Sequence, residues 1–260
     1  MHKADDDTRS LGEWADDQLG AGMDGNGACL QCHDSYRANL TAHTRHAADS
    51  SGSSCYNCHM PYTTYGLLKT IRSHTISNPS ASETVDADRP NACNLCHLDK
   101  TLEWTADALN RLYGTPKPEL GEDDKTIASS VLWTLKGDAG ERAIAAQAMG
   151  WAPAQHASGT NWMPPHLATL LDDPYDAVRF IAIRSLRTLP GFGDLQFNFV
   201  APSPDRRQAQ LRTMTAWDRL KTSAGAMPPQ TLVRADRSLD IESVLRLLKS
   251  RNTRRVLLRE

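Results

Sequence analysis

Long apolar runs, aromatic side chains and an excess of one charge are all scarce in this chain of 260 residues. No stretch approaches the roughly 18 uninterrupted apolar residues of a transmembrane helix, so we expect no membrane-spanning segment. The formal net charge at pH 7 is only −2, which argues against a nucleic-acid-binding protein, because that class normally carries a strong basic excess. Aromatic residues make up 6% of the chain, so side chains alone offer little material for a large core.

Cysteine is also scarce, and no cysteine stands outside a single pattern. Two thiols at Cys-x-x-Cys spacing add to the two vinyl groups of one haem, and a histidine directly after them then binds the iron as its proximal ligand. We therefore expect three covalent c-type haems, with His33, His59 and His97 as proximal ligands. The 6 cysteines form three copies of this motif, which are Cys29-Leu-Gln-Cys32-His33, Cys55-Tyr-Asn-Cys58-His59 and Cys93-Asn-Leu-Cys96-His97.

Two other uses of cysteine compete with this interpretation. Paired Cys-x-x-Cys motifs also build zinc ribbons, in which four thiolates hold one tetrahedral metal ion. Six cysteines in an exported protein can instead form three disulfides. Neither alternative explains why a histidine follows the second cysteine in every copy, and six thiolates suit a four-cysteine site poorly. The pattern therefore favours haem attachment over both.

Three histidines outside the motifs match the three expected haems in number. His43, His46 and His74 lie between the first and the third motif. If each binds one iron on the distal side, every haem has two histidine ligands, which favours a low potential and leaves no position open for a substrate. Each is otherwise a surface histidine, the usual fate of an isolated one, and Met23 competes as a ligand of the first haem. Spacing does not decide which distal histidine serves which haem.

The sequence predicts a mainly α fold in three parts, with little or no β structure. Residues 1–27 are predicted to form an acidic, extended N-terminal arm, and residues 28–115 a loop-rich domain organised by three haems. Residues 116–260 are predicted to form a helical domain, because apolar residues recur there at helical spacing. Expected helices cover Trp104 to Tyr113 and about 125–136, 139–149, 163–172, 175–189, 206–222 and 239–249.

The helix pair at residues 163–189 resembles a HEAT-type repeat, because an Asp-Pro turn at Asp173-Pro174 separates two apolar helices. Such repeats stack so that each helix pair covers the apolar face of its neighbour. The C-terminal end is basic, from Arg234 to Arg259. It is either a solvated helix face or an electrostatic docking surface for an acidic partner or for haem propionates.

The start of the chain and the haem motifs point to an exported protein. Met1-His2-Lys3-Ala4 is followed by three aspartates rather than by the apolar run of a leader peptide. Haem attachment to Cys-x-x-Cys-His takes place outside the cytoplasmic membrane. We therefore expect a periplasmic or outer-surface protein of a bacterium, from which a leader has been removed or which is part of a longer precursor.

Several stretches around the motifs follow the order of a known family. They are His43-Thr-Arg-His46, Ser51-Gly52-Ser53, Cys58-His59-Met60-Pro61, Arg72-Ser-His74, Pro90-Asn91-Ala92-Cys93, Trp104 through Gly114 and Leu171 through Leu186. This order resembles the bacterial multihaem c-type cytochromes related to the cytochrome c-554 group, which join a haem domain to C-terminal helical repeats. The likeness covers roughly residues 29–190 and implies distal haem ligation by His43, His46 and His74. Family members usually have more haems, placed further towards the N-terminus. This chain would therefore be a shortened form with fewer haems, or one piece of a longer protein.

Together these observations predict a multihaem electron carrier that is not an enzyme. It is expected to exchange electrons with redox partner proteins, either alone or as a subunit of a larger electron-transfer complex. The alternative is a haem enzyme in which one five-coordinate iron reduces a small oxyanion or a peroxide. That alternative needs an open distal position and nearby acid–base groups, for which Tyr62, Tyr65 and Arg72 are candidates. The three-for-three count of spare histidines favours the carrier.

Overall fold

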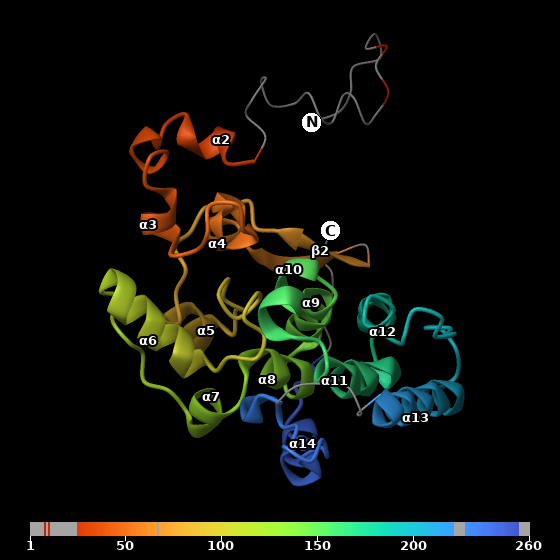
Figure 1. The fold of residues 1–260 in the computed structure, drawn as a ribbon. Helices are drawn as coiled ribbons and strands as arrows, with labels where there is room; N and C mark the ends of the chain where they lie inside the picture. The colour runs from red at the N-terminus through yellow and green to blue at the C-terminus, as the bar shows by residue number, and fades with distance from the viewer. Residues whose placement is uncertain (1–7, 9, 11–24, 67, 221–226, 255–260) are drawn as a thin grey trace. The chain divides into compact units, whose positions relative to one another are not determined.

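The computed structural model describes residues 8, 10, 25–66, 68–220 and 227–254, without the side chains of residues 64–66 (Figure 1). The fold is mainly helical, as predicted. The chain forms two compact units, one ending at Met60 and the other beginning at Pro61. The third haem motif thus shares a unit with the C-terminal helices, whereas the predicted organisation put a boundary at 115/116. The three-part organisation stays a prediction, and its arm lies almost wholly outside the described residues.

The first unit consists of short helical turns. Asn26 links two of them, because its Nδ2 donates to the Ser53 carbonyl at 2.8 Å and its Oδ1 accepts from the Cys55 N–H at 2.9 Å. The Thr44 and Ser53 hydroxyls add a contact at 2.9 Å. The described elements are α2 (Gly27–Leu30), η1 (Asp34–Tyr36), α3 (Leu40–Thr44), η2 (Ser51–Ser53) and α4 (Cys55–His59).

The second unit begins with a small antiparallel hairpin, which the sequence analysis did not predict. Strand β1 (Tyr62–Gly66) pairs with β2 (Lys69–Arg72), and Tyr62 lies opposite Arg72. Both strands pack on helix α9 (Ala139–Met149). The β-branched and aromatic residues of this stretch suit a strand, but the run is too short for the period-2 alternation to stand out in the sequence.

The rest of the second unit is helical. α9 packs on α8 and on α12, and α11 packs on α12 and α13 (Figure 1). Leu135, Met149, Leu167 and Leu186 are fully buried between these helices. The elements are α5 (Ser82–Ala87), α6 (Leu102–Tyr113), α7 (Glu122–Thr126), α8 (Ser129–Leu135), α10 (Ala152–Ser158), α11 (Met163–Thr169), η3 (Leu170–Asp172), α12 (Asp176–Leu186), α13 (Ser203–Arg219), η5 (Pro229–Thr231) and α14 (Ile241–Lys249).

Local signals explain where several of these helices begin and end. Thr101 caps α6 by accepting the Trp104 N–H at 3.1 Å, and Gly114 ends it with a φ of +70°, a conformation that suits glycine. Asp138 and Glu141 form a reciprocal capping box at the start of α9. The helices expected at 139–149, 163–172, 175–189, 206–222 and 239–249 are present with slightly different ends. The HEAT-like character of the 163–189 pair stays a prediction.

Two helical expectations need correction. The single helix expected at about 125–136 is broken between α7 and α8, because Ala128 forms an isolated antiparallel bridge with Thr101 and donates its N–H to the Gln230 carbonyl at 2.8 Å. These partners are distant in sequence, so periodicity could not reveal the break. Helix α10 was not expected, although Pro153 near its start is a favourable residue there.

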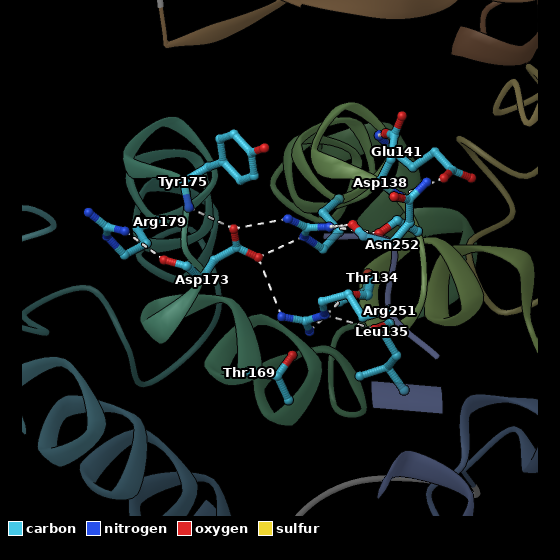
Figure 2. Close-up of polar contacts among 12 residues, drawn as sticks. Thr134, Leu135, Asp138, Glu141, Thr169, Asp173, Tyr175, Arg179, Arg251 and Asn252 are labelled. Carbon is cyan, nitrogen blue, oxygen red and sulfur yellow. Dashed lines mark hydrogen bonds and ion pairs between the residues drawn. The ribbon is translucent and has the colours of Figure 1, made fainter. Parts of the chain in front are cut away.

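A buried ion pair ties the C-terminal segment into the second unit. Arg142 and Asp173 have fully buried side chains and form a two-pronged contact at 2.7 and 3.1 Å. Arg142 also donates to the Gly137 and Asn252 carbonyls, at 2.7 and 3.0 Å. Arg251 approaches the same Asp173 carboxylate at 3.5 Å (Figure 2). The buried Asp173 carboxylate thus has a charged partner in Arg142, as a buried charge requires, and shares its charge with Arg251.

The basic C-terminal end is partly an internal structure. Arg251 has a side chain only 12% exposed and faces Asp173. Arg246 pairs with Asp123 at 2.8 Å, and Arg234 pairs with Asp240 at 3.0 Å. Arg255 and Arg259 lie outside the described residues. Within the described part of the chain, none of the helices combines the length and hydrophobicity needed to cross a membrane.

Candidate haem-binding sites

The six cysteines, all of them among the described residues, form no disulfide. Burial raises the pKa of the Cys58 thiol. Burial also raises the pKa of Cys55, and the neighbouring Cys29 thiol raises it further. Within the described ranges, no group of three or more His, Cys, Asp and Glu side chains converges as ligands of a single metal ion. This donor set fits thioether attachment of haem and does not form the four-thiolate cluster of a zinc ribbon.

The first two motifs lie side by side in the first unit. Cys29 and Cys55, the first cysteines of these two motifs, are in contact. Asn26 fixes the start of α4 by accepting a hydrogen bond from the Cys55 N–H. In the first motif the His33 N–H donates to the Cys29 carbonyl at 3.0 Å, so the motif forms one helical turn. Cys32 and His33 are exposed. Two haems held on these motifs would therefore be close neighbours.

The His43 ring lies near and parallel to that of His59, the predicted proximal histidine of the second motif. The ring centroids of His43 and His59 are 6.1 Å apart and their planes differ by only 5°. Two imidazoles on opposite sides of one metal ion place their centroids roughly 6 Å apart, since each metal–nitrogen bond is about 2 Å long. Burial, and then the nearby His59, lower the pKa of His43. The neutral imidazole that results is the form that binds a metal.

His46 is held in an orientation typical of a metal ligand. Its Nδ1 lies 2.6 Å from the Thr44 carbonyl; a carbonyl only accepts, so Nδ1 carries the proton and Nε2 is left as the electron-pair donor. The ring lies against Gly52, where an added Cβ would be 2.3 Å from the His46 Cδ2. Gly52 therefore allows the close approach of this imidazole.

The remaining predicted distal ligand and the first proximal ligand are less enclosed. His74 is exposed, just beyond the end of β2. The His33 ring lies 6.3 Å from that of Tyr36, and Tyr36 in turn lies 4.3 Å from His43. Of the predicted distal ligands, His43 has its ring parallel to that of a proximal histidine. The ligand roles of His43, His46 and His74 all stay predictions.

The third motif is built into the second unit by buried polar contacts. Asn94, inside the motif, is fully buried. Its Nδ2 donates to the Lys100 carbonyl at 3.0 Å, and its Oδ1 accepts from Asn91 at 2.9 Å and from the Thr105 hydroxyl at 2.8 Å. Leu95, the next residue, is 5% exposed and belongs to the main apolar core. The two middle residues of the motif thus anchor it to the core, while Cys93, Cys96 and His97 are half-buried.

Two serines from the C-terminal helices hold the peptide groups that follow the motif. Ser158, at the end of α10, donates to the Cys96 carbonyl at 3.0 Å and accepts from the Leu98 N–H at 2.8 Å. Ser130 in α8 donates to the Leu98 carbonyl at 2.6 Å. The Trp104 ring lies 5.0 Å from the His97 ring.

Sequence reasoning did not identify these supporting residues. Ser158 lies 62 residues from Cys96, and nothing near it marks it as a partner of a haem motif. Asn94 occupies one of the variable positions of Cys-x-x-Cys-His, where the motif itself places no demand. Trp104 was expected only as an apolar residue of a helix.

Comparison with known proteins agrees with this site. Residues 42–115 match the model of the cytochrome c552 family. That segment includes the second and third motifs, His43, His46 and His74. No curated protein and no solved structure matches the chain. The motifs, the site geometry and the family match define the chain as a c-type cytochrome, an electron carrier with covalently bound haem.

The expectation that the chain is not an enzyme is wrong by the same comparison. Members of the cytochrome c552 family are typically nitrite reductases. The expectation depended on counting three spare histidines against three haems, and a count does not show that each histidine reaches an iron. Among the described residues, the His43 ring lies parallel to that of the proximal histidine His59, and its role as a ligand stays a prediction.

Proposed function

We propose that this c-type cytochrome binds three haems, one at each Cys-x-x-Cys-His motif, and passes electrons through them to or from a redox partner protein. Bound haem supplies a one-electron iron couple. The chain supplies the thiols, the axial histidines and the hydrogen bonds that hold those histidines. We also place the protein outside the cytoplasmic membrane, in the periplasm or on the outer surface, because haem attachment takes place there.

The observation that carries this proposal is the relation between His43 and His59. Parallel imidazoles with centroids 6.1 Å apart suit two axial ligands of one iron. A haem with both axial positions filled exchanges electrons without binding a substrate. The second haem is therefore a relay. The helices α8 to α13 would form a HEAT-like scaffold beside the third haem.

The test is a low-temperature EPR spectrum of the oxidised holoprotein, recorded for the wild type and for His43→Ala. The variant should keep all its haem and convert one low-spin signal into a high-spin signal, because the second iron loses an axial ligand. His156→Ala, an exposed histidine of α10, is the matched control and should leave the spectrum unchanged. An unaltered spectrum in His43→Ala would contradict the proposal that His43 and His59 bind the same iron.

The family match favours a second function, the reduction of a small nitrogen oxyanion such as nitrite at a haem whose distal position is open. The guanidinium carbon of Arg72 lies 4.4 Å from the centre of the Tyr62 ring. This pair supplies a positive charge and a phenol in the second unit. The wild-type EPR spectrum tests this function, because an open iron gives a high-spin signal. Nitrite added to the reduced protein should then oxidise it, and a spectrum that is wholly low-spin, with no oxidation by nitrite, would exclude it.

A further inference from the structure

The hydroxyl of Ser158 holds both peptide groups of His97. The Cys96 carbonyl belongs to the peptide that precedes His97, and the Leu98 N–H belongs to the peptide that follows it. Ser158 donates to the first at 3.0 Å and accepts from the second at 2.8 Å. One side chain therefore restrains the backbone on both sides of the proximal ligand.

This contact lies in the protein interior. Ser158 is 7% exposed and Leu98 is fully buried. The Leu98 carbonyl, which belongs to the next peptide group along the chain, accepts from Ser130 at 2.6 Å, so the backbone on both sides of Leu98 is held by buried hydrogen bonds. Buried hydrogen bonds of this kind are costly to lose, because the partner groups are left without water.

The side chain of His97 is restrained as well. Trp104, in the first turn of α6, lies 5.0 Å from the imidazole at an interplanar angle of 52°. Trp104 is fixed by its own helix, whose start is capped by Thr101. Backbone and ring of this histidine are thus both set by residues outside the motif.

We propose that Ser158 is a positioning residue for the third haem: by holding both peptide groups of His97 it sets the orientation of this ligand and, through it, the reduction potential of the iron that His97 binds. The proposal rests on the three-haem function proposed above. Orientation of the axial ligand, hydrogen bonds around it and exclusion of water are established controls of such potentials. Ser158 does not itself touch the iron.

The test is a redox titration of the holoprotein, followed optically and by EPR, with haem quantified beforehand. Ser158→Ala should keep three haems per chain and lower the midpoint potential of one of them. The direction follows because a looser site admits water, which stabilises the more highly charged oxidised iron. The EPR g values of the same haem should change. That haem should be the one missing from Cys93→Ala/Cys96→Ala, which assigns it to the third motif.

Two variants control for a general effect of altering the core. Ser158→Thr keeps a hydroxyl and should retain most of the wild-type potential. Ser129 is also buried, at 2% exposure, but its hydroxyl has no hydrogen-bond partner. Ser129→Ala should therefore leave all the midpoint potentials unchanged. An unchanged potential in a folded Ser158→Ala, or an equal shift of all the haems, would overturn the proposal.

Trp104→Leu is a second route to the same site if Ser158→Ala does not fold. Trp104 is 36% exposed, so the fold should tolerate the change, and the signal of the third haem should alter while the other two persist. No change at that haem would contradict the assigned restraint on His97. A haem content below three in the wild type is a different result, because it would reject the proposed function itself.

Discussion

In the unit that ends at Met60, the first two motifs begin in α2 and α4, helices of only 4 and 5 residues, and Cys32 and His33 of the first motif are exposed. In the unit that begins at Pro61, the third motif contains a fully buried asparagine. Serines from two helices distant in sequence donate hydrogen bonds to the backbone of the motif and of the residue that follows it. The same five-residue motif is thus supported mainly by local contacts in one unit and by a packed core in the other.

This difference bears on what haem does for each unit. In the described part of the first unit, Leu30 is the one buried apolar side chain of the motif helices, so these helices bury little apolar surface of their own. Bound haem would supply much of its core. The second unit has an extensive core of its own. We therefore expect changes in the helical core to act on the third haem and changes near Asn26 or Gly52 to act on the first two.

The largest effect is expected from Asp173→Ala. It leaves the fully buried Arg142 without its carboxylate and should lower the free energy of unfolding by about 3–5 kcal/mol. Denaturant titration followed by far-ultraviolet circular dichroism measures this. Asp123→Ala, which breaks the exposed pair with Arg246, should cost less than about 1 kcal/mol. Equal costs for the two variants would contradict the role of the buried pair in holding the second unit.

A smaller, pH-dependent effect is expected from His166. Burial lowers its pKa to about 4, against 6.5 in the unfolded chain, although a bond to the Thr231 carbonyl partly offsets this. Above pH 6.5 both states are neutral; as the pH falls from 6.5 to 4, the unfolded state alone takes up the proton. The wild type should lose about 3 kcal/mol across this range relative to His166→Gln. If the free energies of unfolding of the two proteins changed in parallel from pH 6.5 to 4, the lowered pKa of His166 would be contradicted.

Gly52→Ala should act on the first unit. The added Cβ would lie 2.3 Å from the His46 Cδ2, so the imidazole must move, at a cost of about 1–3 kcal/mol. If His46 binds iron, one EPR signal changes as well. Gly193→Ala, where the nearest atom is 3.9 Å away, is the control and should be neutral. A Gly52→Ala protein with unaltered stability would show that the ring is free to shift.

The smallest effect is expected from Asn26→Ala, which removes the bonds to Ser53 and Cys55. Because these groups are only partly buried, the cost should be about 1 kcal/mol. Hydrogen exchange of the Cys55 amide should accelerate, while amides of α9 stay protected. Asn26→Asp keeps the acceptor and should restore the protection of Cys55. Faster exchange throughout both units would show that they are not separate in stability.

Local patterns in the sequence predicted much of this structure, and long-range contacts account for most of what was missed. The haem motifs are local patterns, and so is the spacing of apolar residues in α9. The threonine that caps α6 and the glycine that ends it are local signals as well. The break at Ala128 depends on Thr101 and Gln230. The support of His97 by Ser158 spans 62 residues.

The pairing of histidines shows the same limit at the site. His43 and His46 could be recognised as candidates from composition and spacing. That the His43 ring lies parallel to the His59 ring depends on how the chain around α3 and α4 folds, which no spacing rule gives. Counting histidines against haems therefore predicted candidate ligands but not which irons they reach, and it led to the mistaken exclusion of an enzyme.

The most direct test of the account is the haem content of the purified holoprotein, from a pyridine haemochrome assay together with the intact mass of wild type and of Cys93→Ala/Cys96→Ala. We predict three haems per chain in the wild type and two in the variant, with the first two sites still loaded. Fewer than three haems in the wild type, or a mass that requires bound zinc or disulfides at these cysteines, would contradict the account.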